Sequence, residues 1–425
     1  MDINSLMFFL FIFIVILFWL VMTVSDRGGI GLTLHTVFFV YFICVPGYIQ
    51  YIRDAWPWQQ SRIPSNNDVF IVLCELILYA VSFSFGYFLK SRSNEVGDPI
   101  KIVKANTGTI IFGAFTILPV VALIYFVGFT TFFTTRGLVG DIVYSSQHNL
   151  PMLYAFSKFT VFASFLFYLI VLCNKQQMLH SRFIFLLILV LLIAGNIIVN
   201  NPFSSPRFHF LSMLIAICIV LGGWKSKQSS IYLFLFSPLF LYVLFPYTKL
   251  FGTFFYYGGW DFNLNLLDYI STSPDYDAFQ QIVNTFWYVE HVGFSFGLNF
   301  IAGVAFFVPR AIWLSKPINL GILSATANDY VFTNLSAPIV SELYYALGWF
   351  AIVFGGILFG YFFNAFDHTI KLGIERYGVL RYGISVIMVS FSFIIFRGSF
   401  GAVFPLISVL LFIFSLHSYV RCCRW

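Results

Sequence analysis

The chain has 425 residues, of which 60% are hydrophobic and only 9% are charged. A soluble globular protein carries roughly 25% charged residues, so the composition excludes a soluble domain and predicts a single integral membrane domain over residues 1–425. The formal net charge of +6 is spread over many loops. A nucleic-acid partner would need a basic stripe on one face, so none is expected, and the cysteines show no zinc or disulfide spacing.

About eleven apolar segments predict an all-α polytopic fold, because each approaches the roughly 20 residues that a helix needs to cross a bilayer. A single charged residue, Asp2, precedes the first segment and no small-residue cleavage site follows it, so we expect it to remain as an anchor. The expected spans cover residues 6–24, 32–49, 69–89, 109–127, 152–172, 183–199, 208–221, 231–245, 339–363, 382–396 and 403–420.

The basic residues between these segments fall mainly in alternate loops, a pattern that marks the cytoplasmic side of a membrane protein. It predicts an outer N-terminus, although Arg53, Arg62 and Arg136 then fall on the outer side as exceptions. The basic residues of the inner loops are Lys90, Arg92, Lys101, Lys104, Lys175, Arg182, Lys225, Lys227, Lys371, Arg376, Arg381, Arg421 and Arg424.

The same topology places one large loop, residues 251–338, on the outer side. A connection of this length is too long to be a plain link between helices, so we expect it to hold structure of its own. Its apolar stretch at residues 293–308 is suited to a re-entrant or interfacial segment, which needs protein or a water-filled cavity around it.

Two outer-face arginines lie at the ends of expected spans, where the positive-inside bias disfavours them. Arg207 opens the seventh span in a Ser-Ser-Pro-Arg-Phe sequence, and Arg397 occupies a tight turn between the last two spans. A planar guanidinium can bind two phosphate oxygens at once, so both are candidate ligands of a lipid pyrophosphate. The alternatives are a snorkelling anchor for Arg207 and a simple turn charge for Arg397.

Two further outer cations, Arg310 and Lys316, bracket Trp313 between Pro309 and Pro317. Prolines fix local backbone angles and prevent a helix from running through, so this segment is a stiff loop that presents two positive charges. Trp313 is typical of the boundary between water and lipid. The alternative is a loop that only caps the membrane domain.

Three residues are candidates for a general base. Glu342 lies near the start of the ninth span, where a carboxylate is stabilised by the helix N-terminus and is also placed to accept a proton from a substrate hydroxyl. Asp277 and His291 are competing bases in the preceding outer loop, where each is also consistent with a solvated loop residue.

Three other patterns favour structural interpretations. Asp275 and Asp277 have the spacing of a divalent-metal pair for nucleotide sugars, but such sugars are absent from the outer face, so we expect no metal or other cofactor. Glu75 lies inside the third span and favours a structural hydrogen bond over a proton relay. Gly356 and Gly360 form a small-xxx-small pair that predicts close helix packing.

The segment at residues 277–348 resembles the O-antigen polymerase family. It contains Asp277, a Pro-Arg-Ala-Ile-Trp run that begins at Pro309, a Lys-Pro pair at Lys316, and a Glu-Leu-Tyr sequence that begins at Glu342. These motifs cover about a sixth of the chain, and the Pro-Arg-x-x-Trp-x-x-Lys-Pro spacing is the most specific of them.

The resemblance implies a GT-C-like glycosyltransferase in the bacterial inner membrane, with its active site facing the periplasm. Its substrates would be undecaprenyl-pyrophosphate-linked oligosaccharides, and its partners the membrane lipids and a chain-length regulator protein. Fixed cations would stabilise the pyrophosphate that leaves. The implied roles are pyrophosphate binding by Arg207, Arg310, Lys316 and Arg397, proton acceptance by Glu342 or else Asp277 or His291, and sugar stacking by Trp313.

Other functions remain as alternatives. An O-antigen ligase would transfer the finished glycan with similar machinery, and the Pro-Arg-x-x-Trp sequence argues against it. A transporter or flippase of lipid-linked oligosaccharides often carries paired internal repeats and broken helices, and the sequence has no such repeat. A structural scaffold would leave the outward-facing arginines unexplained.

Overall fold

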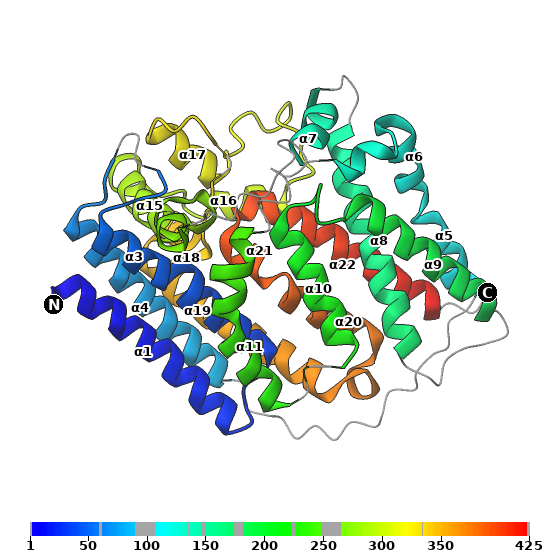
Figure 1. Ribbon diagram of the computed structural model, residues 1–425, viewed down its shortest axis with the longest axis horizontal. Helices are drawn as coiled ribbons and strands as arrows, with labels where there is room; N and C mark the ends of the chain where they lie inside the picture. Colours follow the sequence, from blue (N-terminus) through cyan, green and yellow to red (C-terminus); the bar gives the residue numbers. More distant parts are fainter. Residues whose placement is uncertain are drawn as a thin grey trace.

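The computed structural model describes residues 2–58, 62–89, 107–134, 136–145, 150–173, 182–222, 224, 226–247, 265–333 and 335–422. Within these ranges the chain is all-helical and has no strand. The helices run side by side through most of the molecule, and several shorter helices are gathered along one edge of the bundle (Figure 1). We call this edge, which carries α7 and α14–α18, the upper face.

Nine helical segments among the described residues are long and apolar enough to cross a membrane. Each overlaps an expected span, so the polytopic all-α prediction is confirmed at this level. The nine segments are Ile3–Val24 (α1), Ile30–Arg53 (α2, η1 and α3), Asn66–Leu89 (α4), Thr107–Val127 (α5 and α6), Leu150–Cys173 (α8), Arg182–Val199 (α9), Lys227–Tyr247 (α11, η3 and α12), Trp349–Leu372 (α19) and Phe400–Val420 (within α22).

The remaining two expected spans form helices that fall short of these criteria. α10 (Arg207–Val220) has 14 residues. α20 (Ile374–Ser390) has 17 residues and is broken at Gly378, whose φ of 73° is a left-handed conformation that glycine adopts readily. A short helix, α21 (Ser392–Arg397), follows α20. The count of eleven spans is therefore not confirmed among the described residues.

The expected span at residues 339–363 is also divided. α18 (Ile339–Leu347) ends at Gly348, whose φ of 61° reverses the backbone, and α19 starts at Trp349. Glycine tolerates this angle because it has no Cβ. Glu342 therefore lies on a short separate helix and not at the start of a membrane span.

Two membrane helices widen into π-helical turns beside prolines. Phe38–Cys44 (η1) precedes Pro46, and Phe240–Leu244 (η3) lies between Pro238 and Pro246. A proline has no N–H to donate to the carbonyl four residues earlier, so the regular hydrogen-bond ladder is interrupted at these points. Such π-bulges are absorbed within otherwise continuous helices.

Close contact between α4 and α19 forms one centre of the bundle. A Cβ built on Gly360 would lie 2.1 Å from the carbonyl oxygen of Phe83, and one on Gly86 would lie 2.0 Å from that of Ile357. A Cβ on Gly356 would meet the Ser82 Cβ at 2.7 Å. The small residues let the two backbones approach closely, so the packing that the Gly356–Gly360 pair predicts is confirmed.

At the opposite, lower end of the bundle, a buried carboxylate holds α2 (Ile30–Val37) against α19. Asp367 accepts hydrogen bonds from the backbone N–H groups of Gly31 at 2.6 Å and Leu32 at 3.0 Å, and from the Tyr87 hydroxyl at 2.8 Å. The first N–H groups of a helix lack partners within the helix. Asp367 therefore caps α2 from a distant part of the chain.

The upper face carries the described part of the large loop. It contains α14 (Leu266–Thr272), the 3₁₀ turn η4 (Pro274–Tyr276), α15 (Ala278–Val292), α16 (Leu298–Val304) and α17 (Leu320–Ala327). These elements and α18 lie together in Figure 1. The apolar stretch at residues 293–308 folds into α16 and its flanking turns, and α16 packs against α22 (Phe400–Cys422).

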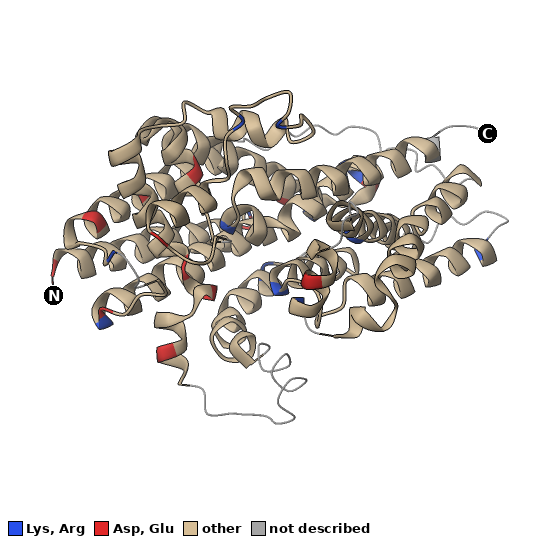
Figure 2. Ribbon diagram, turned by 90° about the horizontal axis from the view of Figure 1, so that it is seen from above, with Lys and Arg blue, Asp and Glu red and all other residues tan. Residues whose placement is uncertain are grey.

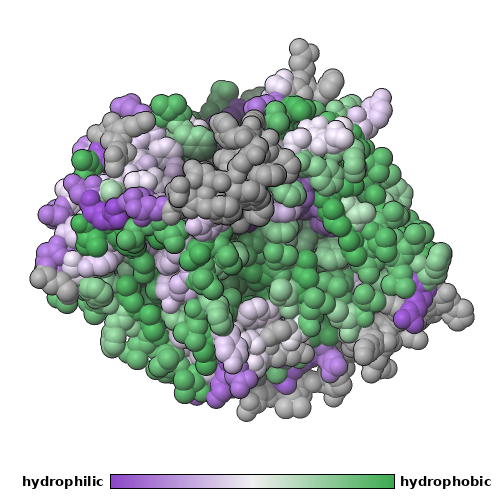
Figure 3. Space-filling model, viewed as in Figure 1, coloured by the Kyte–Doolittle hydropathy of each residue, from purple (hydrophilic) through white to green (hydrophobic). Residues whose placement is uncertain are grey.

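The outer surface of the bundle is suited to lipid. Figure 3 shows a broad apolar band across the visible face, with most hydrophilic residues of this face along its upper and lower margins. Figure 2 shows that charged residues are sparse along the helices. A continuous apolar surface of this kind is costly in water, which agrees with a multi-pass membrane protein.

We predict that Gly360→Ala or Gly86→Ala destabilises the protein by about 1–3 kcal/mol, because each added methyl group collides with backbone of the facing helix. Thermal unfolding in detergent measures the effect. Gly137→Ala is the control, since nothing lies within 4 Å of a Cβ at that position. Equal midpoints for all three variants would show that the close approach of α4 and α19 contributes nothing.

Candidate functional site

A cleft of about 1260 Å³ opens at the upper face between α7 (Arg136–Ser145), α10, α21 and the segment around η4. We call it the arginine cleft, because three arginines line it. The charged residues and histidine of its lining are Arg136, Asp141, Arg207, His209, Asp275, Asp277 and Arg397. It therefore brings together two of the predicted pyrophosphate ligands, Arg207 and Arg397, and one of the predicted bases, Asp277, from sequence positions up to 190 residues apart.

Arg207, the first residue of α10, reaches from the bundle to η4. Its Nη2 donates to both carboxylate oxygens of Asp275 at 2.8 Å, and its Nη1 donates to the Phe245 carbonyl at 3.2 Å. The guanidinium also lies 4.5 Å from the centre of the Phe245 ring. Pro206, immediately before it, fixes the backbone where α10 begins. These contacts hold Arg207 in one orientation, with 27% of its side chain still exposed.

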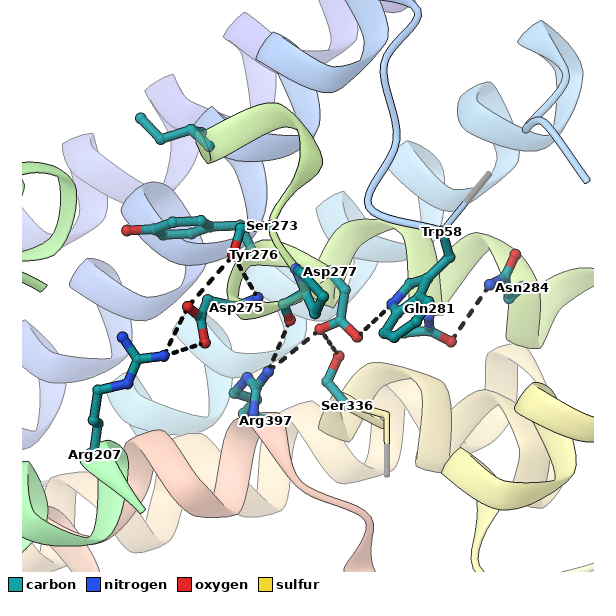
Figure 4. Close-up of polar contacts among 12 residues, drawn as sticks. Trp58, Arg207, Ser273, Asp275, Tyr276, Asp277, Gln281, Asn284, Ser336 and Arg397 are labelled. Carbon is teal, nitrogen blue, oxygen red and sulfur yellow. Dashed lines mark hydrogen bonds and ion pairs between the residues drawn. The ribbon is translucent and has the colours of Figure 1, made fainter. Parts of the chain in front are cut away.

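Arg397, the last residue of α21, forms the second link to the same segment. Its Nη2 lies 3.4 Å from Oδ1 of Asp277 and 3.3 Å from the Pro274 carbonyl. The guanidinium stacks 4.9 Å from the centre of the Phe208 ring, and 24% of the side chain remains exposed. Its Nε has no partner among the residues that the structure describes. Arg397 is thus held more loosely than Arg207, and Figure 4 shows both side chains turned toward the aspartates.

Asp277 is 1% exposed although it borders the cleft, and its carboxylate is held by three side chains. Ser336 donates to Oδ1, which Arg397 also contacts, and the indole N–H of Trp58 donates to Oδ2 at 3.1 Å. Burial raises the pKa of Asp277 above its usual range, against the opposing effects of Arg397, Ser336 and Trp58. This carboxylate is consequently a stronger proton acceptor than an ordinary aspartate.

Asp275, two residues earlier, has the opposite electrostatic character. Burial alone would raise its pKa, but Arg207, the Tyr269 hydroxyl and Arg397 together hold the pKa below its usual range. Asp275 therefore stays ionised as the partner of Arg207. The Asp-x-Asp pair that resembles a metal site instead contacts two different arginines, as Figure 4 shows.

Glu342 lies behind the cleft wall and does not line the cleft. Its Oε2 accepts from the Asn299 side-chain amide at 2.7 Å, and its Oε1 accepts from the Ser399 hydroxyl at 2.7 Å and the Phe400 N–H at 3.0 Å. It is 1% exposed, and burial raises its pKa, against these hydrogen bonds. Ser399 does line the cleft. The structure thus places Glu342 where it holds the turn that follows Arg397.

The cations of the Pro-Arg-x-x-Trp-x-x-Lys-Pro segment lie outside the cleft lining and bind backbone carbonyls. Lys316 Nζ donates to the carbonyls of Ala305, Phe306 and Val308 at 2.9–3.1 Å, just after the end of α16. Arg310 donates to the carbonyls of Lys316 at 2.7 Å and Pro317 at 3.2 Å. The two cations therefore close this loop on itself.

Two other predicted site residues also lie outside the lining of the arginine cleft. Trp313 is partly exposed within the loop that Arg310 and Lys316 close. His291 is exposed near the end of α15, where its Nδ1 lies 2.8 Å from the Trp287 carbonyl and its ring lies 4.3 Å from the Trp287 ring. The structure does not bring either residue to Asp277 or Arg397.

Four residues of the site region had no functional role in the sequence analysis. Arg136 counted only as an exception to the charge pattern, and Trp58 and Ser336 resemble many other polar and aromatic residues of the outer loops. Lys158 lies within an apolar span, in α8. A charged residue within such a span is a candidate functional residue. The sequence alone could therefore have pointed to Lys158.

Comparison of the chain with protein-family models, with curated proteins and with solved structures gives no match. Function is therefore argued from the geometry of the site and from the motifs of the sequence.

We predict that Lys316→Met loosens residues 298–317, because three hydrogen bonds from one ammonium group to backbone carbonyls are lost at once. Hydrogen exchange followed by mass spectrometry measures the change, with Lys227→Met on the lower face as the control. Unchanged protection in Lys316→Met would mean that these contacts do not hold the loop, and that the ammonium group is available to a ligand.

Proposed function

We propose that this protein is a glycosyltransferase of the O-antigen polymerase type. It joins oligosaccharide repeat units carried on undecaprenyl pyrophosphate, at the periplasmic face of a bacterial inner membrane. The observation that carries the proposal is the arginine cleft, which places Arg136, Arg207 and Arg397 beside the buried carboxylate of Asp277. The resemblance of residues 277–348 to that family supports the same reaction.

The cleft has the chemistry that a pyrophosphate leaving group requires. A guanidinium presents five N–H donors in a fixed plane and binds phosphate oxygens two at a time. Arg207 and Arg397 are oriented by ion pairs and aromatic rings, so they need little reorganisation when negative charge develops. Both are partly exposed to the cleft, and an incoming phosphate group would compete with the aspartates for their N–H groups.

The reaction assigns one step to each group. A hydroxyl oxygen of the acceptor repeat unit attacks the anomeric carbon of the donor glycan. The bond between that carbon and the phosphate oxygen breaks, and its electron pair leaves with undecaprenyl pyrophosphate. The hydroxyl proton passes to the Asp277 carboxylate. Arg207 and Arg397 stabilise the charge on the leaving group, and Asp275 keeps Arg207 oriented.

Asp277 is a better base than Asp275 or Glu342 for two reasons. The raised pKa of Asp277 brings it closer to neutral pH, where a general base is most effective, whereas the pKa of Asp275 is lowered. Two neighbouring carboxylates with pKa values pushed apart are typical of divided roles in catalysis. Glu342 is separated from the cleft by Ser399, which donates to it.

The orientation in the membrane follows from the ends of the helices. The upper face carries the arginine cleft, whereas Lys227 at the start of α11 and Lys371 at the end of α19 lie at the lower end. Because Lys227 and Lys371 belong to the basic inner loops that the sequence predicts, the positive-inside rule makes the upper face periplasmic. The cleft then opens on the side where lipid-linked repeat units are polymerised.

Complementation of a strain that lacks the gene tests the proposal. We predict that the wild-type gene restores a lipopolysaccharide ladder, and that Asp277→Asn, Arg207→Met and Arg397→Met each leave only core bearing a single repeat unit. Arg53→Met is the matched control, because Arg53 pairs with Asp268 on the same face outside the cleft lining. Band patterns on silver-stained gels, with membrane levels of each variant, provide the readout.

Other outcomes of this experiment have definite meanings. Loss of every repeat-bearing band in the deletion strain would contradict a polymerase and indicate a ligase or a flippase. A full ladder from Asp277→Asn would leave the polymerase in place and eliminate Asp277 as the base.

The pH dependence tests the base separately. Asp277 must be deprotonated to accept a proton, so activity is present above its pKa and is lost as the pH falls through it. Ser336 lowers this pKa by donating to the carboxylate. We predict that Ser336→Ala shifts the acidic limb of the kcat/KM profile to higher pH. The control is Ser271→Ala, which removes a hydroxyl bonded to the Asp268 carbonyl and should leave the acidic limb of the profile unchanged. An equal shift in both variants would exclude Asp277 as the group that titrates in this limb.

A further inference from the structure

Lys158 is a buried basic residue in the first half of the chain's fifth apolar segment. It lies on α8 and is 3% exposed. Its Nζ donates to the Ser205 hydroxyl at 2.8 Å and to the Tyr154 hydroxyl at 3.2 Å, and it also lies 4.7 Å from the centre of the Tyr154 ring. No carboxylate among the described residues forms an ion pair with it.

A charged lysine in this environment carries a large desolvation cost. Burial of an ammonium group in a medium of low dielectric constant is costly unless a negative charge compensates it. The two hydroxyl groups and the aromatic ring supply hydrogen bonds and a quadrupole, but neither cancels the charge. The charged form of Lys158 has no carboxylate partner among the described residues, so a phosphate group bound nearby would stabilise it.

The surroundings of Lys158 form one wall of the arginine cleft. Ser205, its acceptor, immediately precedes Pro206 and Arg207, both of which line the cleft. Arg136 and His209, which also line the cleft, lie close enough to interact electrostatically with Lys158. α8 packs against both α7 and α10, so these residues share one side.

The two sides of the cleft differ in charge. The α7–α8–α10 wall, defined by Arg136, Lys158 and Arg207, contains a single carboxylate, Asp141, among its described cleft-lining residues. The segment around η4 supplies the other two carboxylates of the cleft, Asp275 and Asp277, which pair with Arg207 and Arg397. In addition, α10 points its N-terminus, the positive end of a helix dipole, into the cleft at Arg207.

We propose that the α7–α8–α10 wall is the phosphate-binding side of the cleft, and that Lys158 is a positioning residue that fixes its positive potential from behind. The inference rests on the proposed function and adds an orientation to it. The pyrophosphate of the donor lies against this wall, and the acceptor hydroxyl lies against the Asp277 side. Lys158 does not touch the substrate; it acts through Ser205 and the start of α10.

Binding of farnesyl pyrophosphate, a soluble prenyl pyrophosphate, to the purified full-length protein tests this orientation. We predict that Lys158→Met, which preserves the shape of the side chain but removes the charge, weakens binding roughly tenfold through loss of one nearby unit charge. Lys158→Arg keeps the charge and should retain most of the affinity. Ser205→Ala keeps the charge as well and should cost less than Lys158→Met. Lys227→Met on the lower face is the control.

The outcomes separate this inference from the proposed function. If wild-type protein does not bind the pyrophosphate, the proposed function fails. If wild-type protein binds and Lys158→Met binds equally well, the function stands and the role of Lys158 is excluded. Equal losses in folded Lys158→Met and Lys158→Arg would also exclude it, because the effect would then be structural.

A second variant keeps the test decisive if Lys158→Met does not fold. Arg136 is an exposed residue of α7, and Arg136→Met removes a positive charge from the same wall. We expect it to weaken binding and to reduce the dependence of affinity on salt, because one screened cation is removed. Unchanged affinity and salt dependence in Arg136→Met would overturn the assignment of this wall to the phosphate.

Discussion

The need to compensate charge at the edge of a membrane domain determines the arrangement of this protein. Arg207 is the first residue of α10 and Arg397 is the last residue of α21, and each pairs with a carboxylate on the same short segment around η4. An arginine left unpaired in such a partly buried position is costly. The two ion pairs therefore dock the extramembrane helices onto the bundle, and they do so at one point, beside the arginine cleft.

The contacts that fix the fold here are also the contacts that a substrate would use. A phosphate group that binds Arg397 competes with Asp277, whose link to Arg397 is long at 3.4 Å, whereas Arg207 contacts Asp275 at 2.8 Å through both oxygens. The looser pair is the one that includes the proposed base. Loss of its arginine partner would raise the pKa of Asp277 further, since Arg397 opposes the effect of burial. In the proposed reaction, donor binding and activation of the base would therefore be coupled through one side chain.

Sequence patterns predict the features that depend on exposure to water or lipid, such as apolar spans. They fail for residues whose roles depend on contacts formed only in the folded chain. Apolar length located the nine segments of the described residues that are long and apolar enough to cross a membrane, and Arg207 and Arg397 do line the cleft. The same charge argument selected Arg310 and Lys316, whose side chains instead bind carbonyls of their own loop. A sequence does not reveal which carbonyls lack partners. The break at Gly348 is equally hidden, because a glycine within an apolar run is compatible with a continuous span.

Asp275 and Asp277 show most clearly what the sequence alone does not predict. In the sequence they are an Asp-x-Asp pair with one set of properties, and local spacing suggests that they act together. In the structure, the 3₁₀ turn η4 directs one toward Arg207 and Tyr269, and the other into a pocket formed by Trp58, Ser336 and Arg397. The pKa of the first is lowered and that of the second is raised. Both carboxylates contact an arginine, and distant segments of the chain, not the motif itself, decide which pKa is lowered and which is raised.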